Sequence, residues 1–519
     1  MADIVLTTLN AKYIHAAFGL RYLMANLGPL RSKARIIEFD IHHRPLDMAE
    51  ALLAQNPSII GFGVYIWNVA PTTEVIAALK RLRPDVIIVI GGPEVSYEIE
   101  TQAIAQLADY VITGEADLKF AELCHQLLSG QLPDSKILAA DLPDFSQLTL
   151  PYELYDEQDI AHRIIYVEAS RGCPFTCEFC LSSLDIPVRQ VLLPKLLQEM
   201  QRLLDRGVKR FKFVDRTFNL NIAVSKAILE FFLDRYKPGY FFHFELIPDR
   251  LPAALREIIA QFPPGALQFE VGIQTFNEQV GTLIRRRQNY QRLEENLAFL
   301  RDCTDVHVHA DLIAGLPGES LESFAAGFDR LVALSPQEIQ VGILKRLRGT
   351  PIVRHDFEWQ MIYNPQPPYE ILQHKLIDFA TMQKLRRFAR YWDLIANSGN
   401  FVETTPLLWG VGTASSPHSL PVSPFHAFLR LSEWLLTRAG RTDSIALVRL
   451  MELLFDYLSG ELKHDPAHIA VPLWRDYCRG GRRDKPLFLR PYLSAAPEIP
   501  PANRRPDLPR RQARHLADL

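Results

Sequence analysis

The most informative stretch of this sequence reads Ser170-Arg171-Gly172-Cys173-Pro174-Phe175-Thr176-Cys177-Glu178-Phe179-Cys180. It places three cysteines in the spacing C-x3-C-x2-C. The run 164–169 just before it is mostly apolar and rich in β-branched residues, which predicts a strand. We therefore expect the cysteines on a loop that leaves the carboxyl end of a strand, where α/β sheets and barrels hold their reactive groups.

Three thiolates are one fewer than the four that hold an ordinary iron–sulfur cluster. A cluster held by Cys173, Cys177 and Cys180 alone would leave one iron open to an outside ligand. The same cysteines could instead supply three ligands of a structural zinc, or pack as small buried hydrophobes. Zinc sites usually combine two C-x2-C pairs, and the sequence has no second pair. The triplet favours the cluster and leaves the two alternatives open.

The totals limit the class of protein. A chain of 519 residues can form two or three domains with full cores, and its net charge of −3 implies no polyelectrolyte partner. The other three cysteines, Cys124, Cys303 and Cys478, are scattered, which is typical of a reducing cytoplasm rather than of a disulfide framework. The sequence shows neither a leader nor a stretch as long as a membrane span. We therefore expect a cytoplasmic protein without a membrane partner.

Residues 1–130 alternate apolar strand runs with amphipathic helical stretches. Five such units in succession predict an α/β fold with a doubly wound, Rossmann-like (flavodoxin-like) parallel sheet, whose ligands bind above the carboxyl ends of the strands. Glycine-bearing turns follow the third, fourth and fifth strand runs, although a tight turn alone would explain any single glycine. The residues that we expect to contact a ligand here are Gly61, Gly91, Gly92, Gly114 and Glu115.

Residues 163–350 repeat the alternation of strand and helix about six times. The expected strands are 164–169, 210–214, 240–246, 267–273, 306–314 and 337–344. The cysteine motif after the first strand, with an aromatic residue before the third cysteine, resembles the radical S-adenosylmethionine (SAM) superfamily. The resemblance implies a partial (β/α)6 barrel and a [4Fe-4S] cluster whose open iron binds SAM. It also implies that an electron from the cluster cleaves SAM to a 5′-deoxyadenosyl radical.

The ends of the later strands carry further matches to this superfamily. Glu270 and Gln274 stand in a match to the E-x-G-x-Q-S pattern, and the segment 311–319 resembles G-x-I-x-G-x-x-P-x-E. A carboxylate such as Glu270 can accept two ribose hydroxyls. A structural role at a strand end remains an equal alternative for any one acidic residue. By resemblance, the residues expected to contact SAM are Asp215, Glu270, Gln274, Gly315 and Pro317.

The first domain carries a resemblance of its own. Gly91-Gly92-Pro93-Glu94 after the fourth strand and the run 109–115 around the fifth resemble the cobalamin-binding domain that precedes many radical SAM domains. Other cobalamin proteins carry D-x-H-x-x-G after the first strand, with a histidine that ligates cobalt. Here His15 precedes Gly19 without that spacing. The resemblance therefore implies cobalamin without a protein histidine ligand, and the departure leaves open that the domain no longer binds it.

Three further segments complete the expected organisation. Residues 131–162 are polar and bear prolines, which predicts an extended linker between the domain at 1–130 and the barrel at 163–350. Amphipathic patterns predict a helical cap over residues 351–480. Residues 481–519 are rich in Pro and Arg, which predicts a disordered, basic tail.

These resemblances imply a cobalamin-dependent radical SAM methyltransferase that acts on an unreactive carbon of a small-molecule substrate. Its partner would be a one-electron reductant such as flavodoxin or ferredoxin. Three alternatives stay open: a radical SAM enzyme that cyclises, oxidises or rearranges its substrate without methylation, an RNA-modifying enzyme, and a non-catalytic carrier of metal or cobalamin. Only the basic tail favours RNA, so we expect no nucleic-acid partner.

Overall fold

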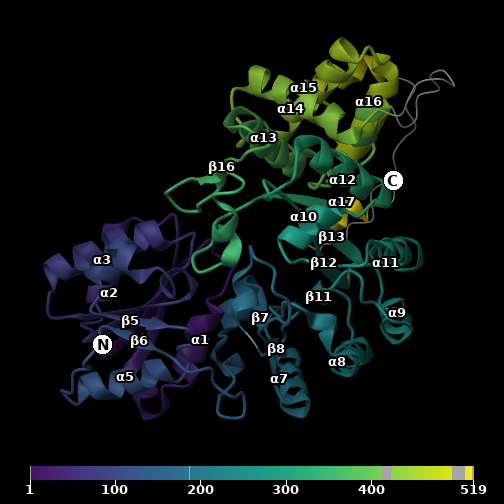
Figure 1. Cartoon of the computed structure of the whole chain (residues 1–519). Coiled ribbons are helices and arrows are strands. Elements are labelled where there is room, and N and C mark those ends of the chain that lie inside the picture. The colour runs from purple at the N-terminus through teal and green to yellow at the C-terminus, as the bar shows by residue number, and fades with distance from the viewer. Residues whose placement is uncertain (1, 186, 411–421, 494–508, 517–519) are drawn as a thin grey trace. The chain divides into compact units, whose positions relative to one another are not determined.

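The chain divides into two compact units (Figure 1). The computed structural model describes residues 2–185, 187–410, 422–493 and 509–516. The first unit consists of Met1–Phe218, Lys345–Arg354 and Tyr363–Glu370, and the second consists of Asn219–Leu344, His355–Ile362 and Ile371–Leu519. The first unit therefore includes both the glycine-bearing turns and the cysteine motif.

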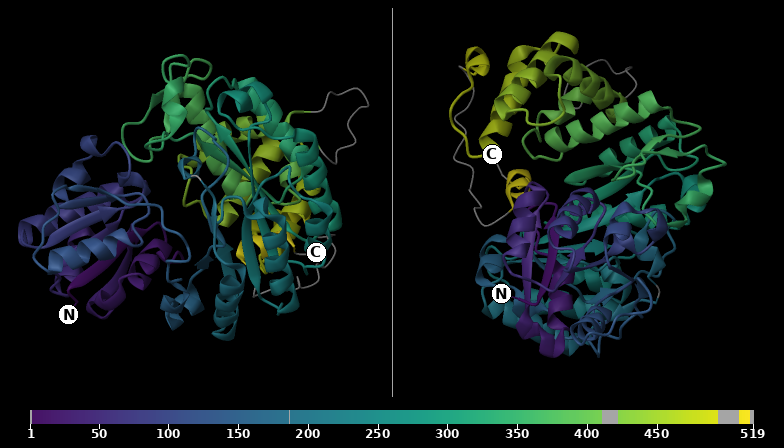
Figure 2. Two further views of the ribbon diagram at one scale, coloured as in Figure 1. Left: turned by 60° about the horizontal axis from the view of Figure 1, so that its bottom comes forward. Right: turned by 90° about the vertical axis from the view of Figure 1, so that its left-hand side faces the viewer.

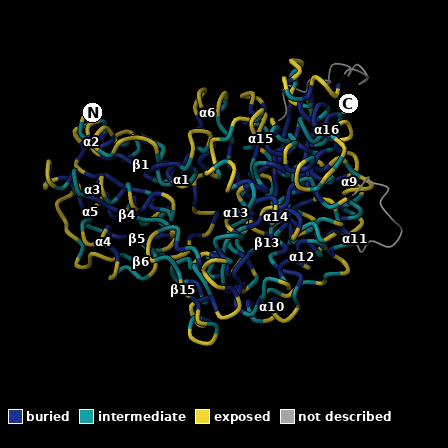
Figure 3. Tube along the Cα trace, turned by 90° about the horizontal axis from the view of Figure 1, so that it is seen from above, coloured by how far each residue is buried: buried dark blue, intermediate teal, exposed yellow. Residues whose placement is uncertain are grey.

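The first unit contains a six-stranded parallel sheet in the order β2-β1-β3-β4-β5-β6. Its strands are β1 (Ile4–Asn10), β2 (Ala34–Asp40), β3 (Ile59–Gly63), β4 (Ile87–Gly91), β5 (Tyr110–Thr113) and β6 (Ile137–Ala139). Every residue of β1 is buried, as in a central strand covered on both faces, and Figure 3 shows this burial in dark blue.

Helices cover both faces of this sheet, as Figure 2 shows for the purple and blue part of the chain. One apolar core lies beneath α1 (Phe18–Ala25) and α5 (Lys119–Leu128). The other lies beneath α2 (Pro45–Leu53), α3 (Val69–Leu82) and α4 (Ala103–Leu107). Because successive strand residues point to opposite faces, near-continuous apolar strands supply both cores. The doubly wound fold that the sequence predicted is confirmed.

The sixth strand differs from the sequence-based expectation. β6 lies in residues 131–162, which we expected to be an extended linker, and pairs with β5 at the edge of the sheet. The same segment contains α6 (Glu157–His162), which begins with a capping box formed by Asp156 and Asp159. An edge strand of three residues offers too little alternation to be predicted from its sequence.

Six further strands form a second parallel sheet in the order β14-β13-β12-β11-β10-β7. They are β7 (Ile165–Val167), β10 (Arg210–Phe213), β11 (Phe241–Leu246), β12 (Leu267–Gln274), β13 (His307–Ala314) and β14 (Glu338–Ile343). Five of the six lie inside the expected ranges, and β12 runs one residue further. The number and sequential order of the strands are those of the partial barrel that the resemblance implied.

In the second unit, β12 and β13 each have one apolar and one polar face. β12 alternates four buried apolar residues with four partly buried ones, which include Glu270 and Gln274. Because side chains alternate along a strand, these two share a face. His309 and Asp311 of β13 stand in register with Glu270 and Gly272 and therefore lie on the same face. The residues predicted to bind SAM on β12 thus lie among other polar side chains.

The region predicted to be helical contains α13 (Phe379–Ile395), α14 (Pro424–Ala439), α15 (Leu447–Asp456) and α16 (Pro466–Arg479). Aromatic rings pack it against α12 (Leu321–Leu334): the centroid of the Phe328 ring of α12 lies 5.0 Å from that of Phe388 and 4.8 Å from that of Trp392, both in α13. No helix among the described residues combines the length and the hydropathy that a bilayer crossing requires.

Part of the Pro- and Arg-rich tail is ordered, although we expected disorder. Helix α17 (Arg510–His515) packs within the second unit, where the buried Gln512 donates a hydrogen bond of 2.7 Å to the side chain of Gln268. Polar contacts rather than apolar burial hold this helix, so a prediction from hydrophobicity misses it. The parts of the tail at 494–508 and 517–519 lie outside the described residues.

Candidate functional site

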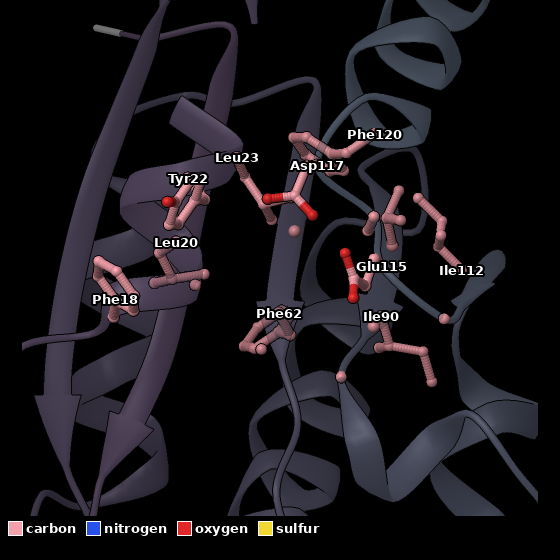
Figure 4. A pocket seen from close by; sticks show the side chains of 18 of the residues that line it. Phe18, Leu20, Tyr22, Leu23, Phe62, Ile90, Ile112, Glu115, Asp117 and Phe120 are labelled. Atoms are coloured by element: carbon pink, nitrogen blue, oxygen red, sulfur yellow. The ribbon is translucent and has the colours of Figure 1, made fainter. Parts of the chain in front are cut away.

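A cavity of about 280 Å³ lies at the carboxyl edge of the first sheet, within the first unit (Figure 4). Its walls come from α1, from the ends of β3, β4 and β5, from the start of α5, and from residues just before the cysteine motif. Figure 4 shows the carboxylates of Glu115 and Asp117 among apolar side chains. The apolar side chains labelled there are Phe18, Leu20, Leu23, Phe62, Ile90, Ile112 and Phe120.

The five residues predicted to contact a ligand in this domain all line the cavity. At Gly61 an added Cβ would lie 2.9 Å from the ring of Phe120. Gly92 has a φ of +113°, and an added Cβ would lie 2.5 Å from the carbonyl oxygen of Val64. At Gly92 only glycine fits, because the collision is with backbone, whereas a side chain at Gly61 would displace the ring of Phe120. Both glycines bring bare backbone to the cavity wall. Contact with a ligand stays a prediction for all five.

Arg171 provides the polar end of the cavity. Its guanidinium donates to Glu115 and Asp117, each at 2.9 Å, and to Glu168 at 3.0 Å. The same group lies over the ring of Tyr22, 4.4 Å from the ring centroid. Only 15% of the Arg171 side chain is exposed. Removing one member of such a buried network leaves another charge unpaired, which is strongly destabilising.

Arg189 extends this network to the strand that pairs with the one containing Arg171. It donates to Glu115 at 2.9 Å and to Asp185 at 2.8 Å. β8 (Ser170–Arg171) and β9 (Arg189–Gln190) pair in antiparallel fashion, so the two arginines stand side by side at the base of the cysteine loop. The turn after β5 and the hairpin are therefore joined by two guanidinium groups that share one carboxylate.

Two of the three acidic residues in contact with Arg171, Glu115 and Glu168, have pKa values shifted in opposite directions. Burial alone would raise the pKa of Glu115, but hydrogen bonds and charges from Arg189 and Arg171 lower it below its ordinary value. At Glu168 burial is the larger effect, and it raises the pKa of the carboxyl despite the contact with Arg171. The charge of Glu115 is thus balanced by Arg171 and Arg189. Its hydrogen bonds hold the two guanidinium groups in place beside the cavity.

Sequence reasoning did not identify four residues of this network: Arg171, Arg189, Asp117 and Glu168. Arg171 and Glu168 stand next to the cysteine motif, and Asp117 stands two residues after Glu115, so each lay beside a recognised motif. No local pattern connects charges that are more than 50 positions apart in the chain, such as Arg171 and Asp117.

The cysteine loop starts from a tight turn at the end of the hairpin. Gly172 has a φ of +89°, and an added Cβ would lie 2.7 Å from the carbonyl oxygen of Asp185. That oxygen accepts a hydrogen bond of 3.1 Å from the amide of Cys173. Cys173 and Cys177 are buried and Cys180 is partly exposed. None of the six cysteines, all of which the structure describes, forms a disulfide.

This loop is compatible with a cluster that three thiolates hold. The three thiols come from one short segment, and Gly172 lets the backbone approach closely where any side chain would collide. Within the described part of the chain, no three His, Cys, Asp or Glu side chains lie close enough together to hold a single metal ion. The thiolates of a cluster bind different irons, so they need not converge on one point.

Asp215 follows β10 and is 2% exposed. Its carboxylate accepts hydrogen bonds from the amide of Ala169 at 2.9 Å and from the hydroxyl of Ser170 at 2.5 Å. Burial raises the pKa of Asp215 to about 7, although these hydrogen bonds favour the charged form. The carboxyl thus holds the strand that leads into the cysteine motif. Contact between Asp215 and SAM stays a prediction.

In the second unit, Glu270 and Gln274 lie on the polar face of β12. The carboxylate of Glu270 is 3.1 Å from the ring nitrogen Nε2 of His243. Gln274 ends the strand with a φ of +73°, at an irregularity in the pairing of β12 with β13. Positive φ is uncommon for a residue other than glycine, and such strain is concentrated at functional sites. This geometry supports the prediction that Gln274 contacts SAM.

The turn after β13 contains the other two predicted SAM residues. Gly315 has a φ of +91°, and an added Cβ would lie 2.6 Å from the side chain of Ile371. Pro317 is buried in the same turn. Glu319, which the sequence analysis did not single out, accepts a hydrogen bond of 2.6 Å from the hydroxyl of Thr275. Burial raises the pKa of Glu319 to about 7, so this contact joins the ends of β12 and β13 with a carboxyl that can carry a proton.

Comparison with protein-family models identifies the domains. Residues 4–124 match the B12 binding domain, and residues 167–331 match the radical SAM superfamily. Residues 357–495 match a family described as a protein of unknown function (DUF4080). The chain therefore contains a B12-binding domain followed by a radical SAM domain, as its motifs predicted.

Two curated relatives show the range of similarity. The uncharacterized methyltransferase PH0819 of Pyrococcus horikoshii is 28% identical over 199 residues, which are 34% of this chain and 43% of the relative. The cobalamin-dependent radical SAM methyltransferase TokK of Streptomyces tokunonensis is 22% identical over 362 residues, which are 59% of this chain and 49% of the relative. The chain thus spans less than half of the length of either relative.

Two solved structures share the fold. TsrM from Kitasatospora setae, with cobalamin and a [4Fe-4S] cluster bound, superposes with a TM-score of 0.54 at 18% identity, over 68% of this chain and 74% of TsrM. The cobalamin-dependent radical enzyme OxsB, with aqua-cobalamin and SAM bound, superposes with a TM-score of 0.61 at 13% identity, over 94% of this chain and 83% of OxsB. At these identities the likeness is one of fold.

We expect the substitution Asp215→Asn to remove part of the pH dependence of stability in the iron-free protein. The pKa of about 7 in the folded state lies above the ordinary 3.8, so the folded protein binds this proton more readily than the unfolded chain. Stability should therefore fall as the pH rises from about 4 to about 7, by at most about 4 kcal/mol from this group. Urea unfolding at pH 5 and pH 8 measures the fall, and a fall of the same size in the variant would contradict the assignment.

Replacing Cys173, Cys177 or Cys180 by Ala should abolish the broad visible absorption of the protein after anaerobic reconstitution with iron and sulfide. With only three thiolates on the loop, the loss of one leaves too few ligands to retain a cluster. The control is Cys303→Ala, which changes an exposed cysteine at the end of α11 (Tyr290–Cys303) and should leave the absorption unchanged. Retained absorption in all three loop variants would exclude the cluster.

Proposed function

We propose that this chain is a cobalamin-dependent radical SAM methyltransferase that acts on an unreactive carbon of a small-molecule substrate. One observation carries the proposal: the cavity of the B12-binding domain and the cysteine loop belong to the same compact unit, and Arg171 is part of both. A carrier of cobalamin alone would have no need for a cysteine loop beside its cavity.

The residues of the first unit suit cobalamin and a [4Fe-4S] cluster. The cavity presents glycine backbone at Gly61, Gly91 and Gly92, and the described residues that line it include no histidine. His15 instead contacts the hydroxyl of Tyr166, at 2.6 Å from its Nδ1. This arrangement supports the proposal that cobalamin binds without a histidine ligand. When bound, the cluster and SAM would supply a radical, and cobalamin would supply a methyl group.

The residues of the second unit are proposed to bind SAM. Glu270 offers a carboxylate for the ribose hydroxyls, and the strained Gln274 would place its side-chain amide beside it. The buried turn of Gly315 and Pro317 offers backbone and apolar surface for a flat ring such as adenine. In the first unit, Asp215 would position the cysteine strand. An electron for this chemistry would come from a reductant such as flavodoxin or ferredoxin.

The names of relatives support methyl transfer more than other radical chemistry. Both PH0819 and TokK are named methyltransferases, and so is TsrM. OxsB is named a cobalamin-dependent radical enzyme, and its superposition covers a larger share of this chain than that of TsrM does. Because that name does not specify methyl transfer, we carry a second candidate, a cobalamin-dependent radical enzyme that does not methylate its product.

Anaerobic turnover with methyl-labelled SAM separates the two candidates. The reconstituted protein is incubated with reductant, cobalamin, labelled SAM and a small-molecule extract. We expect 5′-deoxyadenosine together with label in a new product. The appearance of 5′-deoxyadenosine without labelled product would favour the second candidate. If no 5′-deoxyadenosine forms after full reduction, both candidates are contradicted.

The substitution Gly61→Val should weaken the binding of hydroxocobalamin by about tenfold. A side chain at this position would meet the ring of Phe120, which lies 2.9 Å from the site of an added Cβ, and would push this cavity-lining ring toward the ligand. A loss of about 1.4 kcal/mol of binding free energy corresponds to the tenfold change. Absorbance titration measures the affinity. The control Gly460→Val changes a glycine with no neighbour within 4 Å of an added Cβ and should bind normally. Equal affinity in both variants would place cobalamin elsewhere.

A further inference from the structure

The side chain and the backbone of Arg171 belong to two different parts of the proposed site. Its guanidinium forms the polar end of the cavity and contacts Glu115, Asp117 and Glu168. Its backbone forms β8 and is separated from Cys173 by Gly172 alone. The residue that forms the polar end of the cavity is therefore joined to the first cysteine of the loop through the single tight turn at Gly172.

A second connection runs from the same cavity to the same cysteine. Glu115 accepts hydrogen bonds from Arg189, and Arg189 pairs with the carboxylate of Asp185 at 2.8 Å. The carbonyl oxygen of Asp185 in turn accepts a hydrogen bond of 3.1 Å from the amide of Cys173. The Glu115 carboxylate thus contacts both strands of the hairpin from which the cysteine loop projects.

The tight geometry of the hairpin makes this connection stiff. At Gly172 an added Cβ would lie 2.7 Å from the carbonyl oxygen of Asp185 and 3.1 Å from that of Pro187. The two hairpin strands pair Ser170 with Gln190 and Arg171 with Arg189. Packed elements of this kind move as a body rather than deform, so a change at the arginines reaches the first cysteine.

We propose that Arg171 couples occupation of the cavity to the conformation of the cysteine loop, so that cobalamin in the cavity holds the loop ready for the cluster. The proposal rests on the proposed function, because it takes cobalamin as the ligand. A ligand that fills the cavity excludes water from Arg171, Glu115 and Asp117, which strengthens their mutual attraction. Arg171 acts here as a positioning residue.

Coupling of this kind is reciprocal. If cobalamin stabilises the cluster-binding form of the loop, the assembled cluster must raise the affinity for cobalamin by the same factor. Coupling energies between sites in proteins typically correspond to factors of about 5–150. Both directions can be measured without turnover and without knowledge of the substrate.

The first experiment measures how fast iodoacetamide alkylates Cys173, Cys177 and Cys180 in iron-free protein, kept in the dark with and without saturating methylcobalamin. Peptide mass spectrometry reports each cysteine, and Cys303 serves as an internal exposed reference. We expect methylcobalamin to slow alkylation of the loop by about fivefold or more in the natural sequence. In Arg171→Gln, at methylcobalamin concentrations that saturate the variant, we expect no slowing.

The matched control is Arg163→Gln. Arg163 is also a buried, ion-paired arginine of the first unit, with 12% of its side chain exposed, and it pairs with Glu38 at 3.1 Å and Asp159 at 3.3 Å. It is not among the residues that line the cavity. This variant should lose stability as Arg171→Gln does and yet keep the slowing. Arg171→Lys, which retains the charge without the fork, should give partial slowing and serves if the Gln variant does not fold.

The outcomes separate the inference from the proposed function. If the natural protein does not bind cobalamin at all, the proposed function fails and the inference fails with it. If it binds cobalamin but the loop is alkylated at an unchanged rate, only the inference is overturned. Equal slowing in Arg171→Gln at saturation would show direct shielding by the corrin and would also overturn it. Tighter cobalamin binding after cluster reconstitution, in the natural sequence but not in Arg171→Gln, would support it from the reverse direction.

Discussion

A guanidinium withdrawn from water is stable only among carboxylates, and this requirement fixes the centre of the first unit. Arg171 meets it by contact with Glu115, Asp117 and Glu168, which come from the turn after β5 and from the strand that leads into the hairpin. The turn is part of the B12-binding domain, whereas the hairpin leads into the cysteine loop. The polar end of the cavity and the origin of the cysteine loop therefore follow from one electrostatic constraint.

Buried carboxylates hold two late segments of the chain in the first unit in the same way. The carboxylate of Glu94 accepts hydrogen bonds from Nε of Arg348 at 3.0 Å and from the hydroxyl of Tyr369 at 2.6 Å. The carboxylate of Glu178, within the cysteine motif, accepts a hydrogen bond of 2.6 Å from Nε of Arg354. Only 3% of the Glu94 side chain and 2% of the Glu178 side chain are exposed, so water screens these pairs weakly. The cysteine motif is thus held in place at Glu178, in its middle, as well as at the turn of Gly172 where it begins.

Local patterns in the sequence predicted the elements well and the contacts between them poorly. Strand ranges followed from apolar runs, and the glycine turns of the first sheet followed from its βα order, because both signals are local. The edge strand β6, the ordered helix α17 and the partners of Arg171 escaped prediction. Each of them depends on a partner distant in sequence: β5 for the strand, Gln268 for the helix, and Asp117 for the arginine.

The charges at the cavity also limit which of the ligands known for doubly wound folds could bind there. Dinucleotide sites of this fold place a pyrophosphate at the start of a helix, where backbone amides and the helix dipole favour an anion. Here the carboxylates of Glu115 and Asp117 stand at the cavity, and the arginines beside them are already paired. An anionic nucleotide would have to displace these pairs and leave a buried carboxylate unpaired, at a cost of several kcal/mol of binding free energy. The apolar walls and bare glycine backbone instead favour a ligand that binds by shape and apolar contact. The paired charges that disfavour an anion, Glu115 with Arg171 and Arg189, are the same ones that anchor the cysteine loop.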